Sequence, residues 1–181
     1  MKAKLAAGAL YAALLALAAL VYADEPKGFR DVPWGTSEET LRFRIPTQSC
    51  EDVNSSVDFG TRRCRARNDV TFGKLTPAAV FFYFRNDMLV AWRVTVYPRF
   101  RETLAKTLMQ QYGQPTVVYK GDHVAWKGRT SDVDFVGGAG YDTVEALTKA
   151  ELATREAERQ ERARRASASR QGSGRPASAA R

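Results

Sequence analysis

The feature that most constrains the fold is a pair of β-rich runs within residues 78–97, AAVFFYFRNDMLVAWRVTVY. The runs flank Arg85-Asn86-Asp87-Met88, and Pro98 follows them. In the first run Phe82 and Phe84 alternate with Phe81 and Tyr83. In the second, one face carries Val90, Trp92, Val94 and Val96, opposite Ala91, Arg93 and Thr95. Alternation over two such runs around a short polar turn predicts a β-hairpin with an apolar face and a partly polar face.

The residues after this hairpin predict a helix followed by short strands. Leu104, Leu108 and Tyr112 recur every four residues, which is typical of a buried helix face. Gly113 and Pro115 suit a helix end. Beyond them, residues 116–119, 123–127 and 132–136 indicate three strands separated by glycine-containing turns. Val133 and Phe135 of the last strand oppose Asp132, Asp134 and Val136.

A shorter helix is expected earlier, over residues 36–45. Thr36 and Glu39 match a capping box, in which each side chain binds a backbone N–H of the first turn. Trp34 and Gly35 come immediately before it. We interpret Trp34, Gly35 and Thr36 as a structural clamp, with the ring folded under the first turn. The alternative is an anion site at the helix start, but Glu38 and Glu39 already occupy that field.

Two cysteines, Cys50 and Cys64, are the only ones in the chain. An even number in an exported chain predicts a disulfide. Their spacing and the single histidine do not fit a redox or metal site, so we expect no metal and no cofactor.

An arginine cluster follows in residues 61–67, TRRCRAR. As a strand, this segment would place Arg63, Arg65 and Arg67 on one face, with Arg62 and Cys64 on the other. Arg62, Arg63, Arg65 and Arg67 are therefore candidates for binding an anion or an acidic partner. The alternative is an exposed edge strand that its charges protect from aggregation.

Together these elements follow the order helix, three strands, helix, three strands. We therefore predict an α+β fold of tandem helix-plus-antiparallel-meander units. The helices would pack on one sheet face as a two-layer sandwich. Residues 24–140 are assigned to this folded domain.

The N-terminus predicts export. Lys2 and Lys4 precede an uncharged run rich in Ala and Leu, and Val21-Tyr22-Ala23 suits a cleavage site. This is typical of a signal peptide over residues 1–23, which places the protein in the periplasm or outside the cell. The alternative is a retained membrane anchor.

The C-terminal residues predict a charged helix over residues 141–165 and a disordered basic tail over residues 166–181. Eight Arg and four Glu follow residue 150. No apolar residue larger than alanine follows Leu152 up to residue 165, so such a helix would be solvated. The Gly-rich residues 137–140 lack a following Lys-Ser/Thr, and we interpret them as a linker rather than a phosphate loop.

These motifs resemble small exported bacterial proteins of unassigned function. Gly35-Thr36-Ser37 starts a helix, aromatic strands form a hairpin, and Gly113-Gln114-Pro115 ends a second helix. Over residues 28–137 this order is similar to the fold of β-lactamase-inhibitor protein and of SmpA/OmlA-type outer-membrane assembly lipoproteins. The resemblance implies a binding or scaffold role without catalysis. The lipobox Cys of the assembly lipoproteins is absent, so it does not imply membrane anchoring.

Two classes of function stay open at this point. The first is a non-enzymatic protein that binds another envelope protein or an anionic lipid or glycan surface, with the basic tail adding electrostatic attraction. The second is a small periplasmic hydrolase that uses a carboxylate such as Asp132, Asp134 or Asp122 with His123, the only histidine. Nucleic-acid binding is not expected, because the tail has no interleaved aromatic residues.

Overall fold

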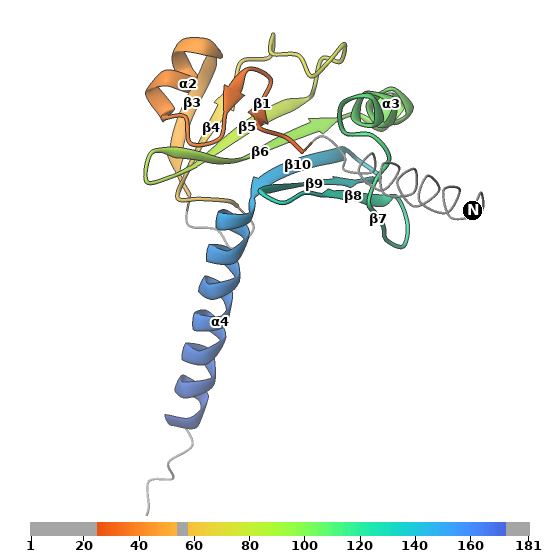
Figure 1. Ribbon diagram of the computed structural model, residues 1–181. Coiled ribbons are helices and arrows are strands. Elements are labelled where there is room, and N and C mark those ends of the chain that lie inside the picture. The colour runs from red at the N-terminus through yellow and green to blue at the C-terminus, as the bar shows by residue number, and fades with distance from the viewer. Residues whose placement is uncertain (1–24, 54–57, 173–181) are drawn as a thin grey trace, which may run out of the picture.

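The computed structural model describes residues 25–53 and 58–172 (Figure 1). Within them an eight-stranded antiparallel sheet carries the fold. Its strands are β3 (Thr47–Asp52), β4 (Arg62–Ala66), β5 (Ala79–Arg85), β6 (Met88–Val96), β7 (Val117–Val118), β8 (His123–Lys127), β9 (Ser131–Val136) and β10 (Asp142–Thr148). The helices are α2 (Glu38–Arg44), α3 (Arg101–Tyr112) and α4 (Lys149–Gly172), and a 3-10 turn, Pro98–Phe100, leads into α3. The chain is therefore α+β, as predicted.

The strand order is β3-β4-β5-β6-β10-β9-β8-β7. Each of α2 and α3 is followed by a four-stranded meander, and the last strands of the two meanders, β6 and β10, pair at the centre of the sheet. The sequence predicted three strands per helix. The two additional strands are β3 at one edge and β10 in the middle.

Both helices face the same side of this sheet. Leu41 of α2 and Leu104 and Leu108 of α3 are fully buried in one apolar cluster with the strand residues Trp92 and Val144. Phe82, Val94, Val133 and Phe135, which alternation placed toward an apolar face, belong to the same cluster. We call this side of the sheet the covered face.

The β5–β6 hairpin was predicted correctly except at one residue. Asn86 and Asp87 both have positive φ angles, 50° and 61°, which suits a two-residue hairpin turn. A bulge then shifts the register between Tyr83 and Phe84, and Phe84 pairs with Leu89. Leu89 therefore joins the buried cluster where the simple alternation had placed Val90.

The prediction of a helix beginning near residue 141 was wrong. Residues 142–148 form β10, and the Gly-rich residues 137–140 form the β9–β10 turn rather than a linker. Val144 and Ala146 point into the covered face, and this burial between two neighbouring strands outweighs the helix propensity of Glu, Ala and Leu. The folded domain thus continues past residue 140.

Helix α4 begins eight residues later than expected and ends later too. Thr148 Oγ1 accepts a hydrogen bond from the Glu151 N–H (3.2 Å), a contact typical of a helix N-cap. The helix then continues to Gly172, beyond residue 166, where the tail was predicted to be disordered. Residues 173–181 lie outside the described part of the chain.

The first helix also begins one residue later than predicted. Ser37, not Thr36, is the N-cap of α2, and its side chain accepts a hydrogen bond from the Thr40 N–H (3.2 Å). The Thr36 hydroxyl donates instead to the Pro33 carbonyl (2.8 Å).

The predicted signal peptide, residues 1–23, lies outside the described residues. None of the described helices has the length and apolar character needed to cross a bilayer.

An N-terminal segment closes the covered face. Strands β1 (Gly28–Phe29) and β2 (Val32–Pro33) form a small separate ladder, and Phe29 and Val32 are buried in the main cluster. The Trp92 indole donates to the Gly28 carbonyl (2.9 Å). Just before this ladder, the Glu25 carboxylate accepts hydrogen bonds from the backbone N–H groups of Thr130 (2.8 Å) and Ser131 (3.4 Å).

Candidate functional site

The second face of the sheet is not covered by α2 or α3, and we call it the open face. It consists of the strand residues that alternate with the buried cluster. From β4 to β8 these include Arg63, Arg65, Phe81, Tyr83, Arg93, Thr95, Thr143, Glu145, Asp134, Val136 and His123. Most of them are partly accessible to solvent, unlike the residues on the covered face. The open face is therefore the side of the sheet that another molecule can reach.

One end of the open face is covered by the base of α4. Tyr83, Ala91 and Leu147 form a small buried cluster with Phe59, and Leu152 of α4 packs against it. Burial raises the pKa of Tyr83 to about 12, and its hydroxyl has no hydrogen-bond partner among the described residues. This corner therefore belongs to the folded core and is not a ligand site.

A buried ion pair fixes the direction of α4. The Glu151 side chain is fully buried, and its carboxylate accepts hydrogen bonds from Arg85 Nε (2.7 Å) and from the Gly60 N–H (2.7 Å). The hydrogen bond that Arg85 donates to Glu151 raises the pKa of Arg85. Glu158, two turns along, binds the same guanidinium at 2.9 Å. The first turns of the helix are thus attached to β5 by charge as well as by packing.

The middle of the open face carries charges that neutralise one another. Arg93 binds Glu145 across β6 and β10. Lys127 Nζ lies 3.0 Å from Asp134, and His123 Nε2 lies 3.2 Å from the same carboxylate. These acids are already compensated, so they do not attract a cation.

Beyond this row, exposed aromatic residues gather at the other end of the face. Tyr97 and Tyr141 lie with ring centroids 5.3 Å apart and are 42% and 51% exposed. The Tyr119 ring stacks on His123 at 4.2 Å. Val136, 43% exposed, pairs with both His123 and Thr143 in the sheet and so lies between the two aromatic groups. We call these five residues (Tyr97, Tyr119, His123, Val136 and Tyr141) the tyrosine patch.

The physical character of this patch favours macromolecular recognition. Tyrosine offers a large rigid ring and a polar hydroxyl, and it is enriched where protein interfaces concentrate their binding energy. Arg99 adds a cation, with its guanidinium 4.9 Å from the Tyr97 ring. The patch is neither a deep cavity nor a cluster of catalytic groups.

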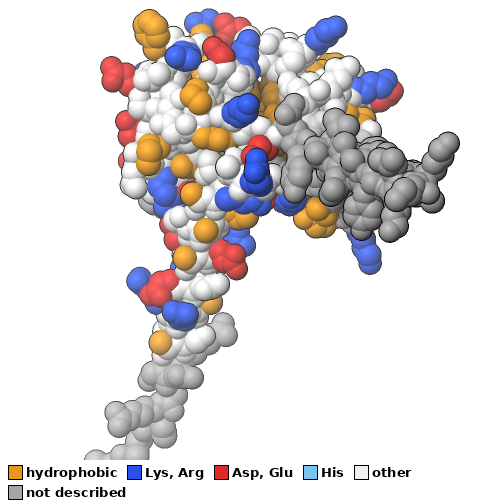
Figure 2. Space-filling view, in the orientation of Figure 1, with side chains coloured by type: hydrophobic (Ala, Val, Ile, Leu, Met, Phe, Trp, Pro, Cys, Tyr) orange, Lys and Arg blue, Asp and Glu red, His pale blue; other side chains and the backbone are white. Residues whose placement is uncertain are grey.

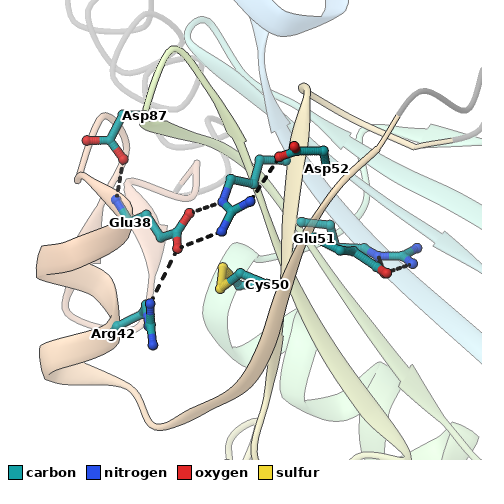
Figure 3. The surroundings of a disulfide bond; sticks show 9 residues. Glu38, Arg42, Cys50, Glu51, Asp52 and Asp87 are labelled. Carbon is teal, nitrogen blue, oxygen red and sulfur yellow. Dashed lines mark hydrogen bonds and ion pairs between the residues drawn. A yellow bond between two sulfur atoms is a disulfide. The ribbon is translucent and has the colours of Figure 1, made fainter.

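The four candidate arginines do not form one site. Arg62 binds Glu38 and Asp52, and hydrogen bonds to these acids raise its pKa. Figure 3 shows Glu38 beside the disulfide, between Arg42 and the guanidinium that binds Asp52. Arg63 points to the open face, where it binds Glu51 and Asp58.

The other two arginines differ in their contacts. Arg67 lies 3.4 Å from Asp69. Arg65 forms no ion pair among the described residues, and its buried Nε has no partner there. Strand β4 has neighbours on both sides, so the alternative of an exposed edge strand was wrong, and β3 holds that position.

The three residues interpreted as a clamp join the N-terminal segment to β6. The Trp34 indole donates to the Pro26 carbonyl (2.7 Å). The Gly35 N–H donates to Leu89 (2.9 Å) at a φ of 80°, and the Thr36 carbonyl accepts from the Leu89 N–H (2.9 Å). Trp34 packs against the main cluster from a partly buried position. These contacts connect the chain after β2 to β6 and to Pro26 before β1.

The predicted disulfide between Cys50 and Cys64 is confirmed, and the two residues face one another across β3 and β4. It is compatible with an exported protein. Glu38 and these two sulfurs form the one group of three possible metal ligands among the described residues. Disulfide sulfurs are not thiolates, so this group does not fit a metal.

The structure brings together only some of the residues proposed for a hydrolase. His123 contacts Asp134 (3.2 Å), and Lys127 also binds this carboxylate (3.0 Å). Asp132 is buried beneath Lys149 (2.6 Å) and Lys127 (3.3 Å), and Asp122 binds Arg101 at the start of α3. The hypothesis of a carboxylate-dependent hydrolase stays a prediction.

A separate apolar pocket of about 330 Å³ lies between α3 and β8. Leu108, Met109 and Trp126 line it, with Arg101 and Asp122 at the rim. These two rim charges bind each other, so neither is available to orient a polar ligand. The tyrosine patch therefore remains the stronger candidate.

Comparison with known protein families, with curated proteins and with solved structures finds no match to this chain. The resemblance to β-lactamase-inhibitor protein and to the assembly lipoproteins stays a prediction.

The tyrosine patch was not predicted from the sequence. Tyr97 and Tyr141 each lie next to the end of a strand, and they meet because β6 pairs with β10. Residues 141–165 were interpreted as a helix, so this pairing was not anticipated. The alternation of Val144 and Ala146 with Thr143 and Glu145 was the available signal.

Proposed function

We propose that this is an exported, non-enzymatic protein that binds another protein of the cell envelope through the open face of its sheet. The observation that carries the proposal is the tyrosine patch. It exposes aromatic surface on a sheet whose other face is covered by α2, α3 and the N-terminal segment. The tandem helix-plus-meander order and the packing of α2 and α3 on a single face favour a two-layer sandwich that presents this surface.

Charge also supports a protein partner. The acids of the open face are neutralised by Arg93 and Lys127, whereas Arg65 and Arg99 have no ion pair among the described residues. A surface with rigid aromatic rings and a few uncompensated arginines suits a partner that offers apolar side chains and carboxylates.

The test is affinity capture from envelope extract with the chain that begins at Asp24. The baits are the wild type, a Tyr97→Ser/Tyr141→Ser variant, and a Phe43→Ser/Met88→Ser control. Phe43 and Met88 are exposed at 93% and 50% but lie away from the patch, on α2 and at the β5–β6 turn.

We expect the tyrosine variant to lose a specifically retained protein by at least about tenfold, because buried interface tyrosines dominate binding energy. The control should retain it. Equal retention by all three baits would exclude the tyrosine patch as the binding surface. A shorter bait should end after Glu158, because Glu151 and Leu152 pack in the folded domain.

A further inference from the structure

Helix α4 separates its charges along its length. Its four acids are Glu151, Glu156, Glu158 and Glu161, so none lies beyond the thirteenth of its 24 residues. From residue 162 to residue 181 the sequence contains six Arg and no acid. Arg162, Arg164 and Arg165 are exposed, and Arg165 forms an ion pair with Glu161 (2.9 Å). The distal half is thus cationic, while the acids serve the base of the helix.

The base of α4 is attached to the folded domain, and the rest of the helix is not. Glu151 and Glu158 bind Arg85, and Leu152 packs on the open face. Residues 156–169 are all exposed, and α4 extends away from the domain as a separate arm (Figures 1 and 2). From Glu158 to Gly172 a helix rises by about 20 Å. The ion pairs therefore hold the cationic half well clear of the sheet.

The composition of the arm limits what it can bind. Within α4 no apolar residue larger than alanine follows Leu152. It therefore has no apolar face to bury against a partner helix or to insert between lipid chains. The interaction left to it is long-range attraction to a dense array of negative charge.

We infer that the distal half of α4 binds the surface of an anionic lipid bilayer electrostatically, without insertion. A bilayer is favoured over a nucleic acid because the Cys50–Cys64 disulfide is compatible with a compartment outside the cytoplasm. The arm starts on the open side of the sheet, where Leu152 packs, so binding would place that side toward the bilayer.

The test uses the chain that begins at Asp24 and vesicles made of equal parts phosphatidylglycerol and phosphatidylcholine. Arg162, Arg164 and Arg165 are changed together to Gln, a residue that also favours helix. A matched control changes Arg42, Arg67 and Arg129, three exposed arginines of the domain, to Gln and so removes the same net charge. Binding is measured by co-sedimentation over a range of salt concentrations.

We expect the wild type to bind these vesicles at low salt, to release them as salt rises, and not to bind pure phosphatidylcholine. The distal triple variant should lose on the order of 100-fold in partitioning, because each arginine near such a surface contributes about fivefold. The control should keep most of the binding. Three results would overturn the proposal: an equal loss in both variants, binding that persists in high salt, or binding to a DNA duplex with none to the vesicles.

Discussion

The two faces of the sheet belong to the same strands but differ in how far their side chains are exposed to solvent. On the covered face, Phe82, Trp92 and Val144 are almost completely shielded from solvent. On the open face, their direct chain neighbours Phe81, Arg93 and Glu145 remain partly accessible. One face supplies an extensive apolar core, so the second face contributes to the core only at the corner that the base of α4 covers. The comparison of the two faces suggests where to look for a binding surface. Strand residues that stay exposed and add little to the core are free to contact another molecule.

The sharpest test of this comparison uses two adjacent phenylalanines of β5. Phe82→Ala should lower the free energy of unfolding by about 3–5 kcal/mol, because it leaves a cavity in the covered face. Phe81→Ala should cost only about 1 kcal/mol, because Phe81 is partly exposed beneath the Arg63 guanidinium. Urea unfolding of both variants measures the difference. Equal losses would mean that the open face also contributes to the core.

A second test concerns the disulfide, whose Cys64 side chain is buried in the covered face. The Cys50→Ala/Cys64→Ala variant should lose about 3 kcal/mol, because a loop of this length constrains the unfolded chain. Thermal unfolding with and without a reductant checks this. The reductant should destabilise the wild type and leave the double variant unchanged. A reductant effect on the double variant would point to another cause.

A third test addresses the one corner where the open face is buried. Glu151→Gln should destabilise the protein by about 2 kcal/mol, because it removes the charge that binds Arg85 in a buried position. Glu158→Gln is the matched control, since Glu158 binds the same arginine but is 45% exposed, and it should cost less than about 0.5 kcal/mol. Chemical denaturation of both variants distinguishes them. If Glu158→Gln were the more harmful change, the anchor would lie further along α4.

The smallest expected effect concerns the N-terminal segment that closes the covered face. Hydrogen bonding from the Thr130 backbone lowers the pKa of Glu25 from its usual 4.5. The stabilisation is therefore fully present above pH 4.5 and is lost as the pH falls through the lowered pKa of the folded state. Glu25→Gln should remove about 1 kcal/mol at neutral pH and less at acidic pH. Unfolding measured from pH 7 to pH 3 tests this, and a loss that grows toward low pH would contradict it.

Regular patterns allowed much of the fold to be predicted. The β5–β6 hairpin and helix α3 repeat their apolar residues so consistently that the sequence alone located them. Strand β3 carries no apolar alternation, because it is an exposed edge whose place is set by Cys50 and by its pairing with β4. Strand β10 contains good helix formers, and only its burial between β6 and β9 makes it extended.

The candidate site was harder to predict from sequence patterns than the fold was. Alternation correctly placed Arg63 and Arg65 on one face of β4. Which arginines are neutralised depends on acids from other elements, such as Glu38 of α2 and Asp58 of a loop, and the local pattern contains no information about them. The tyrosine patch depends on the β6–β10 pairing between residues more than forty positions apart in the chain.

The hydrogen bonds from Thr130 and Ser131 to Glu25 also set an order for events during biosynthesis. A ribosome makes Glu25 first and reaches Thr130 only 105 residues later. At about 5–20 residues per second this leaves an interval of about 5–20 seconds. Throughout it Phe29 and Val32 have only part of their final apolar surroundings, since β9 and β10 do not yet exist. The covered face of the N-terminal half is therefore incomplete until the last strands of the sheet are available.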